Sequence, residues 1–303
     1  MTNTDPLCGP VLHGTLLAGD ADAVAAAYID CFGFRLLADC RISAEHAGAW
    51  QLPALAGQRM LLLATASGAS EWLRIIEAPG CAAPQPLRHH GWMALEVNVQ
   101  DVDALAERLR QPGSPFTIIG EPAFLEISDK IRAMQVAGPA GEVLYLTEVR
   151  APVPPFDLPL SPVDPVDRLF IPVLSTAQRA ASLALHERLA GKSGLVLDTR
   201  VTVLNRAFGH PIERQYPIAV LQLAGQALLE IDQVDDATAQ TPQACGLPAG
   251  IAMISLAIAP GRLAALGIEG STLVAPAHGA RRMALLRGAG GELIELIELI
   301  ETP

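Results

Sequence analysis

Residues 288–298 read GAGGELIELIE, a glycine-rich turn followed by a short run of apolar residues and glutamates. Successive side chains of a strand point to opposite faces, so Leu293, Glu295 and Ile297 should share one face. One carboxylate would then lie between apolar neighbours, and its burial requires a partner. The phrase GPAGEVLYLTE at 138–148 has the same form, with a tyrosine in the place of that glutamate. This repetition indicates duplicated halves.

The composition indicates a globular chain with no nucleic-acid partner. The length of 303 residues suits two domains, and with 50% apolar and 17% charged residues the chain is not of the disordered class. A formal net charge of −11, without a basic run, argues against nucleic-acid binding. No apolar run is long enough to cross a membrane, and the first residues do not resemble a secretory signal.

The cysteines are scattered and include no C-x-x-C pair, a pattern typical of small core residues in a reducing cytoplasm. They are Cys8, Cys31, Cys40, Cys81 and Cys245. We therefore predict a cytoplasmic location and no disulfide.

Hydrophobic periodicity predicts four copies of one unit, in which a strand and a helix are followed by three strands. Their predicted ranges are 11–17, helix 21–33, 34–40, 59–65 and 71–77; 92–97, helix 102–109, 116–119, 131–136 and 143–149; 168–174, helix 181–189, 195–204, 218–223 and 227–234; and 253–258, helix 262–266, 272–276, 282–286 and 293–297. The fold class is therefore α+β, with four βαβββ units.

A proline-rich stretch separates the second unit from the third. Residues 150–165 read RAPVPPFDLPLSPVDP, and such a run cannot occupy a central strand or a helix. We expect a semi-rigid linker there. The predicted domains are residues 1–149, with units one and two, and residues 166–303, with units three and four.

The paired βαβββ unit resembles the vicinal oxygen chelate (VOC) superfamily, which includes glyoxalase I, bleomycin-resistance proteins and extradiol dioxygenases. The residues that carry the resemblance are VLHGTLLAGD at 11–20, HHGWMALEVNVQDVDAL at 89–105, VDRLFIPVLST at 166–176 and GGELIELIE at 290–298. The resemblance implies two VOC-fold domains, each a curved sheet around one pocket.

The resemblance also implies four positions in each pocket that carry metal ligands in the family's enzymes, on the first and last strands of each unit. In the N-terminal half they are His13, Arg74, Trp92 and Tyr145, and in the C-terminal half Arg168, Glu230, Met253 and Glu295. Family enzymes generally bind a divalent metal through histidines and carboxylates, whereas an arginine repels a cation. We therefore predict a degenerate metal site in both halves and no cofactor, with a bound divalent metal as the disfavoured alternative.

The N-terminal half offers a set of candidate ligand-binding residues. Arg74 lies on one strand face with Trp72, and an arginine among apolar neighbours requires an anion. Trp92 and Tyr145 would add flat walls, and His90 would lie on the same face as Trp92. Two interpretations stay open, an aromatic anion bound as a ligand or a carboxylate of the protein itself.

The candidate catalytic residues are His13, Glu230 and Glu295. The two glutamates should approach each other across the C-terminal pocket, where both cannot ionise cheaply unless a cation such as Arg168 lies between them. They could form a salt-bridged cluster that fills a vestigial pocket. One could instead abstract a proton next to a carbonyl group, with Arg168 stabilising the oxygen.

His13 is either a base or hydrogen-bond donor, or a satisfied core histidine. The polar loop 205–216 either covers a pocket or is solvated.

Taken together, these observations predict a small-molecule-binding VOC protein. It would act on an aromatic or carbonyl compound as a lyase, isomerase or dioxygenase relative. The alternative is a non-catalytic binding protein of the resistance or sequestration type. We expect neither a nucleic-acid nor a membrane partner, and a homodimer is one possible assembly.

Overall fold

The computed structural model describes residues 5–126, 128–275 and 279–299, and its strands form two mixed sheets of eight strands each. Sheet I contains the strands of units one and four, in the order β14-β15-β16-β13-β1-β4-β3-β2. Its strands are β1 (Cys8–Ala18), β2 (Arg35–Arg41), β3 (Arg59–Ala64), β4 (Leu73–Glu77), β13 (Gly250–Ile258), β14 (Ser271–Ala275), β15 (Gly279–Arg287) and β16 (Leu293–Leu299).

Sheet II contains the strands of units two and three, in the order β10-β11-β12-β9-β5-β8-β7-β6. Its strands are β5 (Gly91–Val99), β6 (Thr117–Leu125), β7 (Ser128–Ala137), β8 (Val143–Val149), β9 (Val166–Thr176), β10 (Leu195–Arg200), β11 (Gln215–Leu223) and β12 (Ala227–Gln233). The four predicted βαβββ units and the α+β class are therefore confirmed.

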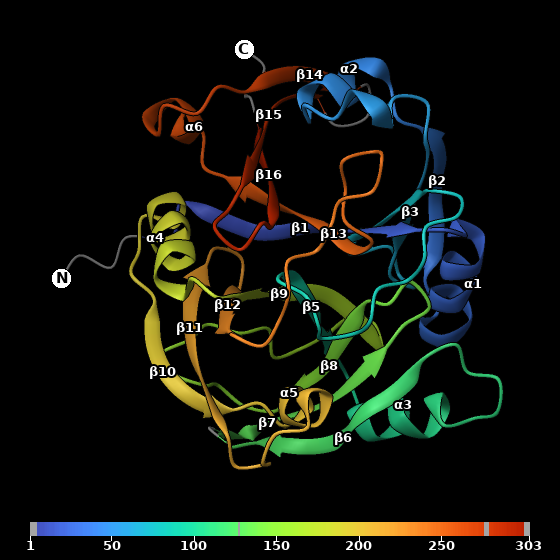
Figure 1. The fold of residues 1–303 in the computed structure, drawn as a ribbon, viewed down its shortest axis with the longest axis vertical. Helices are drawn as coiled ribbons and strands as arrows, with labels where there is room; N and C mark the ends of the chain where they lie inside the picture. Colours follow the sequence, from blue (N-terminus) through green and yellow to red (C-terminus); the bar gives the residue numbers. More distant parts are fainter. Residues whose placement is uncertain (1–4, 127, 276–278, 300–303) are drawn as a thin grey trace.

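The pairing of the units differs from the predicted one. Unit one shares its sheet with unit four through the antiparallel β1–β13 seam, and unit two shares its sheet with unit three through β5–β9. Figure 1 shows this as blue strands beside orange and red ones, and green strands beside yellow ones. All four first strands are apolar and expose two bonding edges, so local sequence does not specify the partner. Residues 150–165 therefore connect two units of the same sheet.

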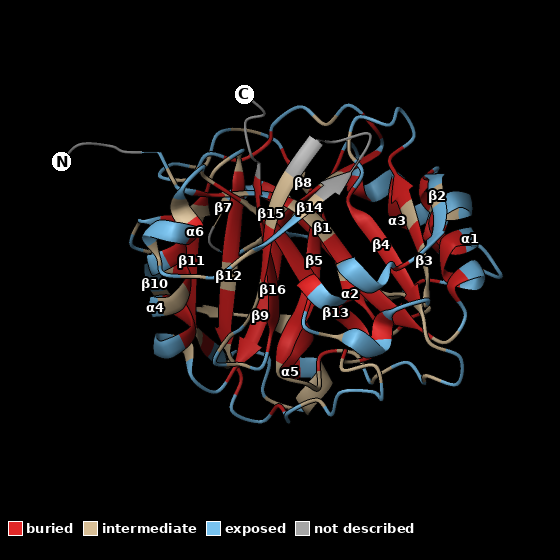
Figure 2. Cartoon of the chain, turned by 90° about the horizontal axis from the view of Figure 1, so that it is seen from above, coloured by how far each residue is buried: buried red, intermediate tan, exposed pale blue. Residues whose placement is uncertain are grey.

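The two sheets pack against each other through a shared apolar core. Strand β1 lies against β9, and β13 lies against β5. Leu16, Leu95, Leu169 and Leu256, one from each unit, are all buried in this core. The approach is close at Gly14, where an added Cβ would lie 3.0 Å from Leu95 Cδ1. Figure 2 shows the strands as the most buried part of the molecule. Each fully buried leucine contributes about 1.5–3 kcal/mol of stability.

One helix follows the first strand of each unit, as predicted. These helices are α1 (Ala21–Phe32), α3 (Val102–Leu109), α4 (Arg179–Ala190) and α6 (Arg262–Ala265). Asp20 and Asp101 cap α1 and α3, because each side chain accepts a hydrogen bond from a first-turn backbone N–H. The apolar stripe of α1, which includes Tyr28, packs into the shared core.

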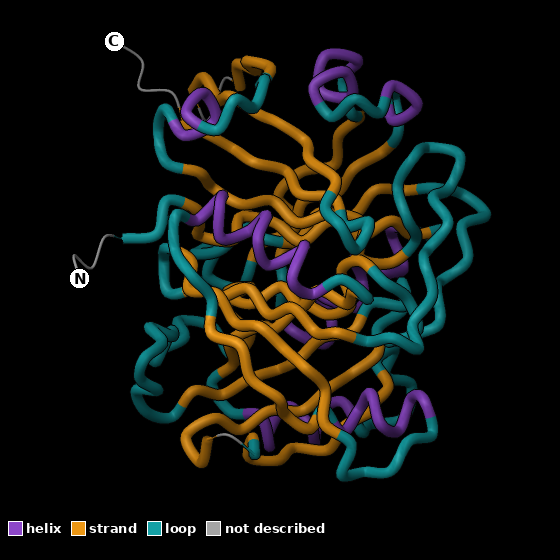
Figure 3. Tube along the Cα trace, turned by 60° about the vertical axis from the view of Figure 1, so that its left-hand side comes forward, coloured by secondary structure: helices purple, strands orange, loops and turns teal. Residues whose placement is uncertain are grey.

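Two further helices, α2 (Ala44–Ala49) and α5 (Thr202–Phe208), follow the second strands of units one and three and were not predicted. Helix α5 replaces the end of the strand predicted at 195–204, and the polar loop 205–216 begins within it. Asn205 Nδ2 holds this loop by donating to two of its carbonyl oxygens. Helix α2 packs against β14 and β15, and α5 packs against β6. Figures 1 and 3 place the two helices at opposite ends of the molecule.

The proline-rich stretch is tied to the folded body. Leu158 is buried, and Asn98 Nδ2 donates to the carbonyl oxygen of Pro159 at 3.3 Å. Asp164 Oδ2 accepts a hydrogen bond from Ser67 Oγ at 2.6 Å. Of the helices in the described part of the chain, none has the length and apolar character needed to cross a membrane.

Candidate functional site

Each sheet has a second face, turned away from the shared core, and a cavity lies over each of these faces. Pocket I, over sheet I, has a volume of about 270 Å³. Pocket II, over sheet II, has a volume of about 120 Å³. The alternation predicted for 293–297 is confirmed, because Glu295 and Ile297 line pocket I whereas Ile294 and Leu296 belong to the shared core.

The floor of pocket I is a buried ion pair between Arg74 of β4 and Glu295 of β16. The Nη2 atom of Arg74 lies 2.5 Å from Glu295 Oε2, and the Ser255 hydroxyl bonds to both side chains. Arg74 Nε also donates to Thr15 Oγ1 at 3.1 Å. Trp50, which follows α2, donates its Nε1–H to Glu295 Oε1 at 2.7 Å. This network joins both units of sheet I to α2.

The electrostatics of this network fix Glu295 as an anion. Burial alone would raise its pKa, but Arg74, helped by Ser255 and His13, holds the pKa at about 2. A carboxylate bonded to three donors and so reluctant to take a proton is a poor general base at neutral pH. The anion next to Arg74 is therefore a carboxylate of the protein, which is the second of the two interpretations left open by the sequence.

Pocket II carries acidic groups without a basic partner. Glu96 of β5 and Tyr145 of β8 are register neighbours, and both line the cavity with Glu230 of β12. Asp232 is fully buried and lies two residues beyond Glu230 on the same strand face. Thr147 Oγ1 donates to Glu96 Oε1 at 2.7 Å. The Tyr145 hydroxyl is buried and has no hydrogen-bond partner among the described residues.

The carboxyl groups of pocket II hold protons near neutral pH. Burial and the neighbouring Glu230 raise the pKa of Glu96 to about 8. Burial raises the pKa of Glu230 to about 7, and burial together with Glu230 raises the pKa of Asp232 well above its usual range. No Lys or Arg forms an ion pair with these three groups in the described ranges of the chain. Arg200 at the pocket edge lies 3.2 Å from Glu126 instead.

The structure divides the predicted site residues between two places. His13, Arg74 and Glu295 line pocket I, whereas Tyr145 and Glu230 line pocket II. The prediction that Glu230 and Glu295 approach each other is wrong, because they lie in different sheets. Units three and four were expected to share a sheet. In the structure unit four pairs with unit one and unit three pairs with unit two, so the two glutamates lie apart.

Two of the predicted ligand-binding residues, Trp72 and Trp92, make hydrogen bonds to backbone carbonyl groups. Trp72 Nε1 donates to the carbonyl oxygen of Asp167 at 2.8 Å, and its ring packs edge-on against Tyr28 in the shared core. Trp92 Nε1 donates to the carbonyl oxygen of Leu293 at 2.7 Å. Both side chains lie outside pockets I and II.

The remaining predicted residues also lie away from these pockets. The His90 Nε2 atom is 3.0 Å from the carbonyl oxygen of Val234. Arg168 is partly buried and lines neither pocket, so it cannot stabilise charge beside Glu230 or Glu295.

Sequence reasoning missed Glu96 and Ser255, which lie on the first strands of units two and four. Of the residues chosen there, Met253 has the same side-chain parity as Ser255, whereas a register shift between Trp92 and Ala94 breaks the alternation, so that Trp92 packs in the shared core and Glu96 lines pocket II. Alternation identifies the face of a strand but not the depth at which a residue lies. Asp232 shares the parity of Glu230, and this signal was available in the sequence.

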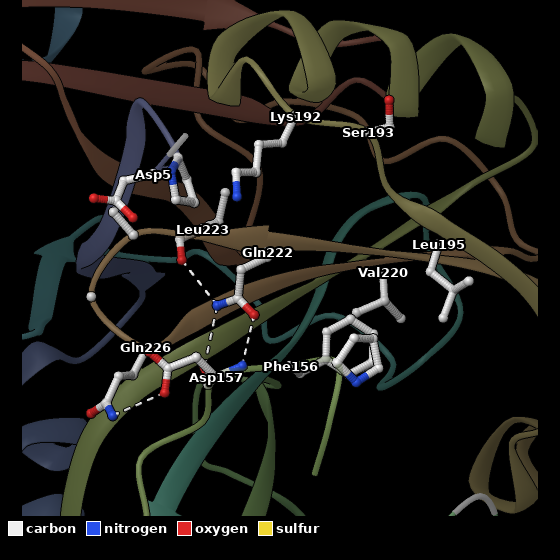
Figure 4. A pocket seen from close by; sticks show the side chains of 14 residues that line it. Asp5, Phe156, Asp157, Lys192, Ser193, Leu195, Val220, Gln222, Leu223 and Gln226 are labelled. Atoms are coloured by element: carbon white, nitrogen blue, oxygen red, sulfur yellow. Dashed lines mark hydrogen bonds between the residues drawn. The ribbon is translucent and has the colours of Figure 1, made fainter. Parts of the chain in front are cut away.

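A further hollow lies outside both sheet pockets, between residues 155–157 and the β11–β12 turn. It has a volume of about 610 Å³. Figure 4 shows hydrogen bonds that link Gln222 and Gln226 to Asp157 in this hollow. Gln222 Nε2 donates to the Asp157 carbonyl oxygen at 3.2 Å, and Gln226 Nε2 donates to Asp157 Oδ1 at 3.2 Å.

The described residues do not fit the divalent metal that the family resemblance implies. No three His, Cys, Asp or Glu side chains within 5–126, 128–275 and 279–299 are arranged to hold a metal ion. In pocket I, the guanidinium of Arg74 already neutralises the one fully buried carboxylate.

Comparison with known proteins agrees with this architecture. Residues 11–125 match the model of the Glyoxalase/Bleomycin resistance protein/Dioxygenase superfamily. The fold is similar to that of a glyoxalase I variant from Zea mays, with a TM-score of 0.59 and 16% identity over 97% of this chain and 94% of that one. A candidate dioxygenase from Bacillus subtilis gives a TM-score of 0.58 and 12% identity, over 97% and 86% of the two chains. No curated protein matches the sequence.

Proposed function

We propose that this chain, of which residues 11–125 match the model of the Glyoxalase/Bleomycin resistance protein/Dioxygenase superfamily, acts on a small carbonyl compound in pocket II by metal-independent proton transfer. The observation that carries the proposal is the convergence of Glu96, Tyr145 and Glu230 on one cavity, where the buried Tyr145 hydroxyl has no hydrogen-bond partner among the described residues. Such a site offers both a base and hydrogen-bond donors.

Glu230 is the proposed base, because its pKa of about 7 is the lower of the two values in the pocket and is matched to proton transfer at neutral pH. It would remove a proton from the carbon next to the carbonyl group. The C–H electron pair then forms a C=C bond, and the carbonyl π pair moves onto oxygen. In an α-hydroxy carbonyl compound, the α-hydroxyl proton passes to the former carbonyl oxygen, a new C=O forms at the former α-carbon, and Glu230 returns its proton to the former carbonyl carbon, which gives the isomeric α-hydroxy carbonyl compound.

Tyr145 and Glu96 are the proposed donors to the developing oxyanion. Burial and the nearby carboxyl groups keep the pKa of Tyr145 well above its usual value, so its hydroxyl retains the proton. Glu96 also retains its proton at neutral pH while its Oε1 accepts from Thr147. A phenol paired with a protonated carboxylic acid is an established way to stabilise an enolate without a metal. These donors take the role that was predicted for Arg168.

Solvent deuterium exchange tests the proposal directly. We expect the protein to accelerate loss of the α-proton NMR signal of small hydroxy- and keto-carbonyl compounds in D₂O. Glu230→Gln should slow this exchange by roughly 10²–10⁴-fold, because the base is lost. Tyr145→Phe should slow it by roughly 10²–10³-fold, because a donor is lost. Glu121→Gln, which changes an exposed carboxylate, serves as the matched control.

The pH profile of the exchange rate should be bell-shaped. The rate should rise as Glu230 ionises near pH 7 and fall as Glu96 loses its donor proton near pH 8. Glu96→Gln keeps a hydrogen-bond donor that does not titrate, so the alkaline limb should disappear while the acid limb stays. An alkaline limb unchanged in Glu96→Gln would contradict the role of Glu96.

A second candidate function is non-catalytic binding of a small organic cation. It is favoured by the absence of any Lys or Arg ion pair at Glu96, Glu230 and Asp232 among the described residues. Calorimetry in buffers of different ionisation enthalpy separates the two functions. Amines that bind with release of protons, while no carbonyl compound exchanges deuterium, would establish the binding function in place of catalysis.

We also expect no stoichiometric transition metal. Elemental analysis of protein purified without chelators checks this expectation. About one iron, zinc, manganese or nickel ion per chain, lost in Glu96→Gln or Glu295→Gln, would contradict it.

The five cysteines are all free, which supports our proposal of a reducing, cytoplasmic location.

A further inference from the structure

Pocket I contains a second cation besides Arg74. Arg281 of β15 lines the cavity, and its Nε atom is buried without a hydrogen-bond partner. The side chain forms neither a hydrogen bond nor an ion pair with any residue that the structure describes. The charge of Arg74 is neutralised by Glu295, so Arg281 is the uncompensated charge of this pocket. A buried donor left without an acceptor is costly, and an anionic ligand would remove that cost.

The histidine of α2 adds a second unsatisfied group. His46 lines pocket I, and its Nε2 atom is buried and has no partner in the described chain. Burial lowers the pKa of His46, so the imidazole is neutral at physiological pH and can donate from one ring nitrogen. Its ring lies 4.1 Å from the Trp50 ring, centroid to centroid, which restrains its orientation.

The rest of the pocket lining is mainly apolar, with acidic groups near the solvent. The apolar residues of the lining are Met60, Leu62, Leu273, Met283 and Ile297. Glu45 and Glu71 also line the cavity, but both are exposed. A cavity of about 270 Å³ with apolar walls and a few polar groups is suited to a small amphipathic molecule.

We propose that pocket I binds a small monocarboxylate with an apolar body, and that Arg281 contacts the carboxylate. The planar guanidinium matches the two oxygens of a carboxylate, and one uncompensated positive charge matches one negative charge. His46 donates to the same group, and the apolar body lies against Met60, Leu62 and Met283. The exposed Glu45 and Glu71 disfavour anions of higher charge, such as phosphate esters.

Thermal unfolding with benzoate as the probe tests this proposal. Benzoate should raise the unfolding temperature by an amount that grows with its concentration, whereas the neutral isostere benzamide should not. In Arg281→Met the affinity for benzoate should fall roughly tenfold to hundredfold, because a charged hydrogen bond is lost. Arg282→Met is the matched control, since the next residue of the strand points to the opposite face and lines no part of pocket I.

Failure of this proposal can be distinguished from failure of the proposed function at pocket II. Glu230→Gln should respond to benzoate as the unchanged protein does, because Glu230 belongs to the other sheet. A benzoate response that persists in Arg281→Met, or that is lost equally in Arg282→Met, would overturn the proposal. So would the absence of any benzoate effect at millimolar concentration. An unfolding temperature of unliganded Arg281→Met close to that of the unchanged protein shows that the variant is folded.

Discussion

Arg74→Met should lower the free energy of unfolding by roughly 3–5 kcal/mol, measured by urea denaturation at neutral pH. The substitution leaves Glu295, which is completely buried, as an anion without its cation. Trp50 and Ser255 still donate to that carboxylate, but they supply no charge. The reciprocal change Glu295→Gln leaves Arg74 as a buried cation without its anion. It should lower the free energy of unfolding by a similar amount.

A double substitution separates the strength of the pair from the cost of breaking it. Replacing Arg74 by Met and Glu295 by Leu together removes both charges and fills a similar volume with apolar atoms. Replacing a whole buried pair in this way is often neutral or stabilising, so the double variant should recover most of the lost stability. If the single and double variants lose equal stability, the destabilisation arises from packing rather than from an unpaired charge.

The same pair makes the protein sensitive to acid. The pKa of Glu295 is about 2 in the folded protein and near its ordinary value in the unfolded chain. The stabilisation is therefore complete above the ordinary value and is lost as pH falls toward 2. Acid unfolding of the Arg74→Met/Glu295→Leu variant should show a smaller dependence of stability on pH in this window.

Cleaving the chain between residues 150 and 165 should not release two folded halves. Each sheet combines strands from both sides of the cut, along the β1–β13 and β5–β9 seams. A protease site introduced at Val163, which is 63% exposed, should give nicked protein that elutes at the size of the intact chain. The fragments 1–149 and 166–303 should each lack a folded circular dichroism spectrum when expressed alone and regain it when expressed together.

The domains predicted from the sequence implied the opposite result, in which each fragment folds alone. A folded monomer from either fragment alone would show that two units of one half can complete a sheet by themselves. The seams seen here would then be only one of two available pairings. The nick itself should not strain the protein, because Val163 lies at an exposed point of the stretch.

Local sequence predicted the four βαβββ units correctly, but it did not predict which units share a sheet. The turn-strand phrase at 288–298 correctly predicted β16 and the face of Glu295, because strand alternation is a short-range property. The choice among four apolar first strands as partners is long-range and is set by packing in the shared core. For this reason Glu230 and Glu295 were wrongly expected to meet.

The candidate sites were predicted only in part, for the same physical reason. Arg74 was recognised as a cation that requires an anion, but its partner Glu295 lies in unit four and could not be identified locally. The segment AEHAGA of α2 is too short to show helical periodicity, so the position of His46 in pocket I and the hydrogen bond from Trp50 to Glu295 were missed. Arg281 was unremarkable in the sequence because its lack of a partner is a property of the folded surroundings.

The pairing of unit one with unit four has a consequence for synthesis on the ribosome. Strand β1 is made first, whereas its neighbour β13 (Gly250–Ile258) is made only after units two and three. At about 5–20 residues per second, the β13 edge of β1 waits for its partner for roughly ten to fifty seconds. Sheet II, whose units are adjacent in the chain, can close during that time. The nascent chain therefore carries an open strand edge through most of its production, and protection of that edge is needed during translation rather than in the finished molecule.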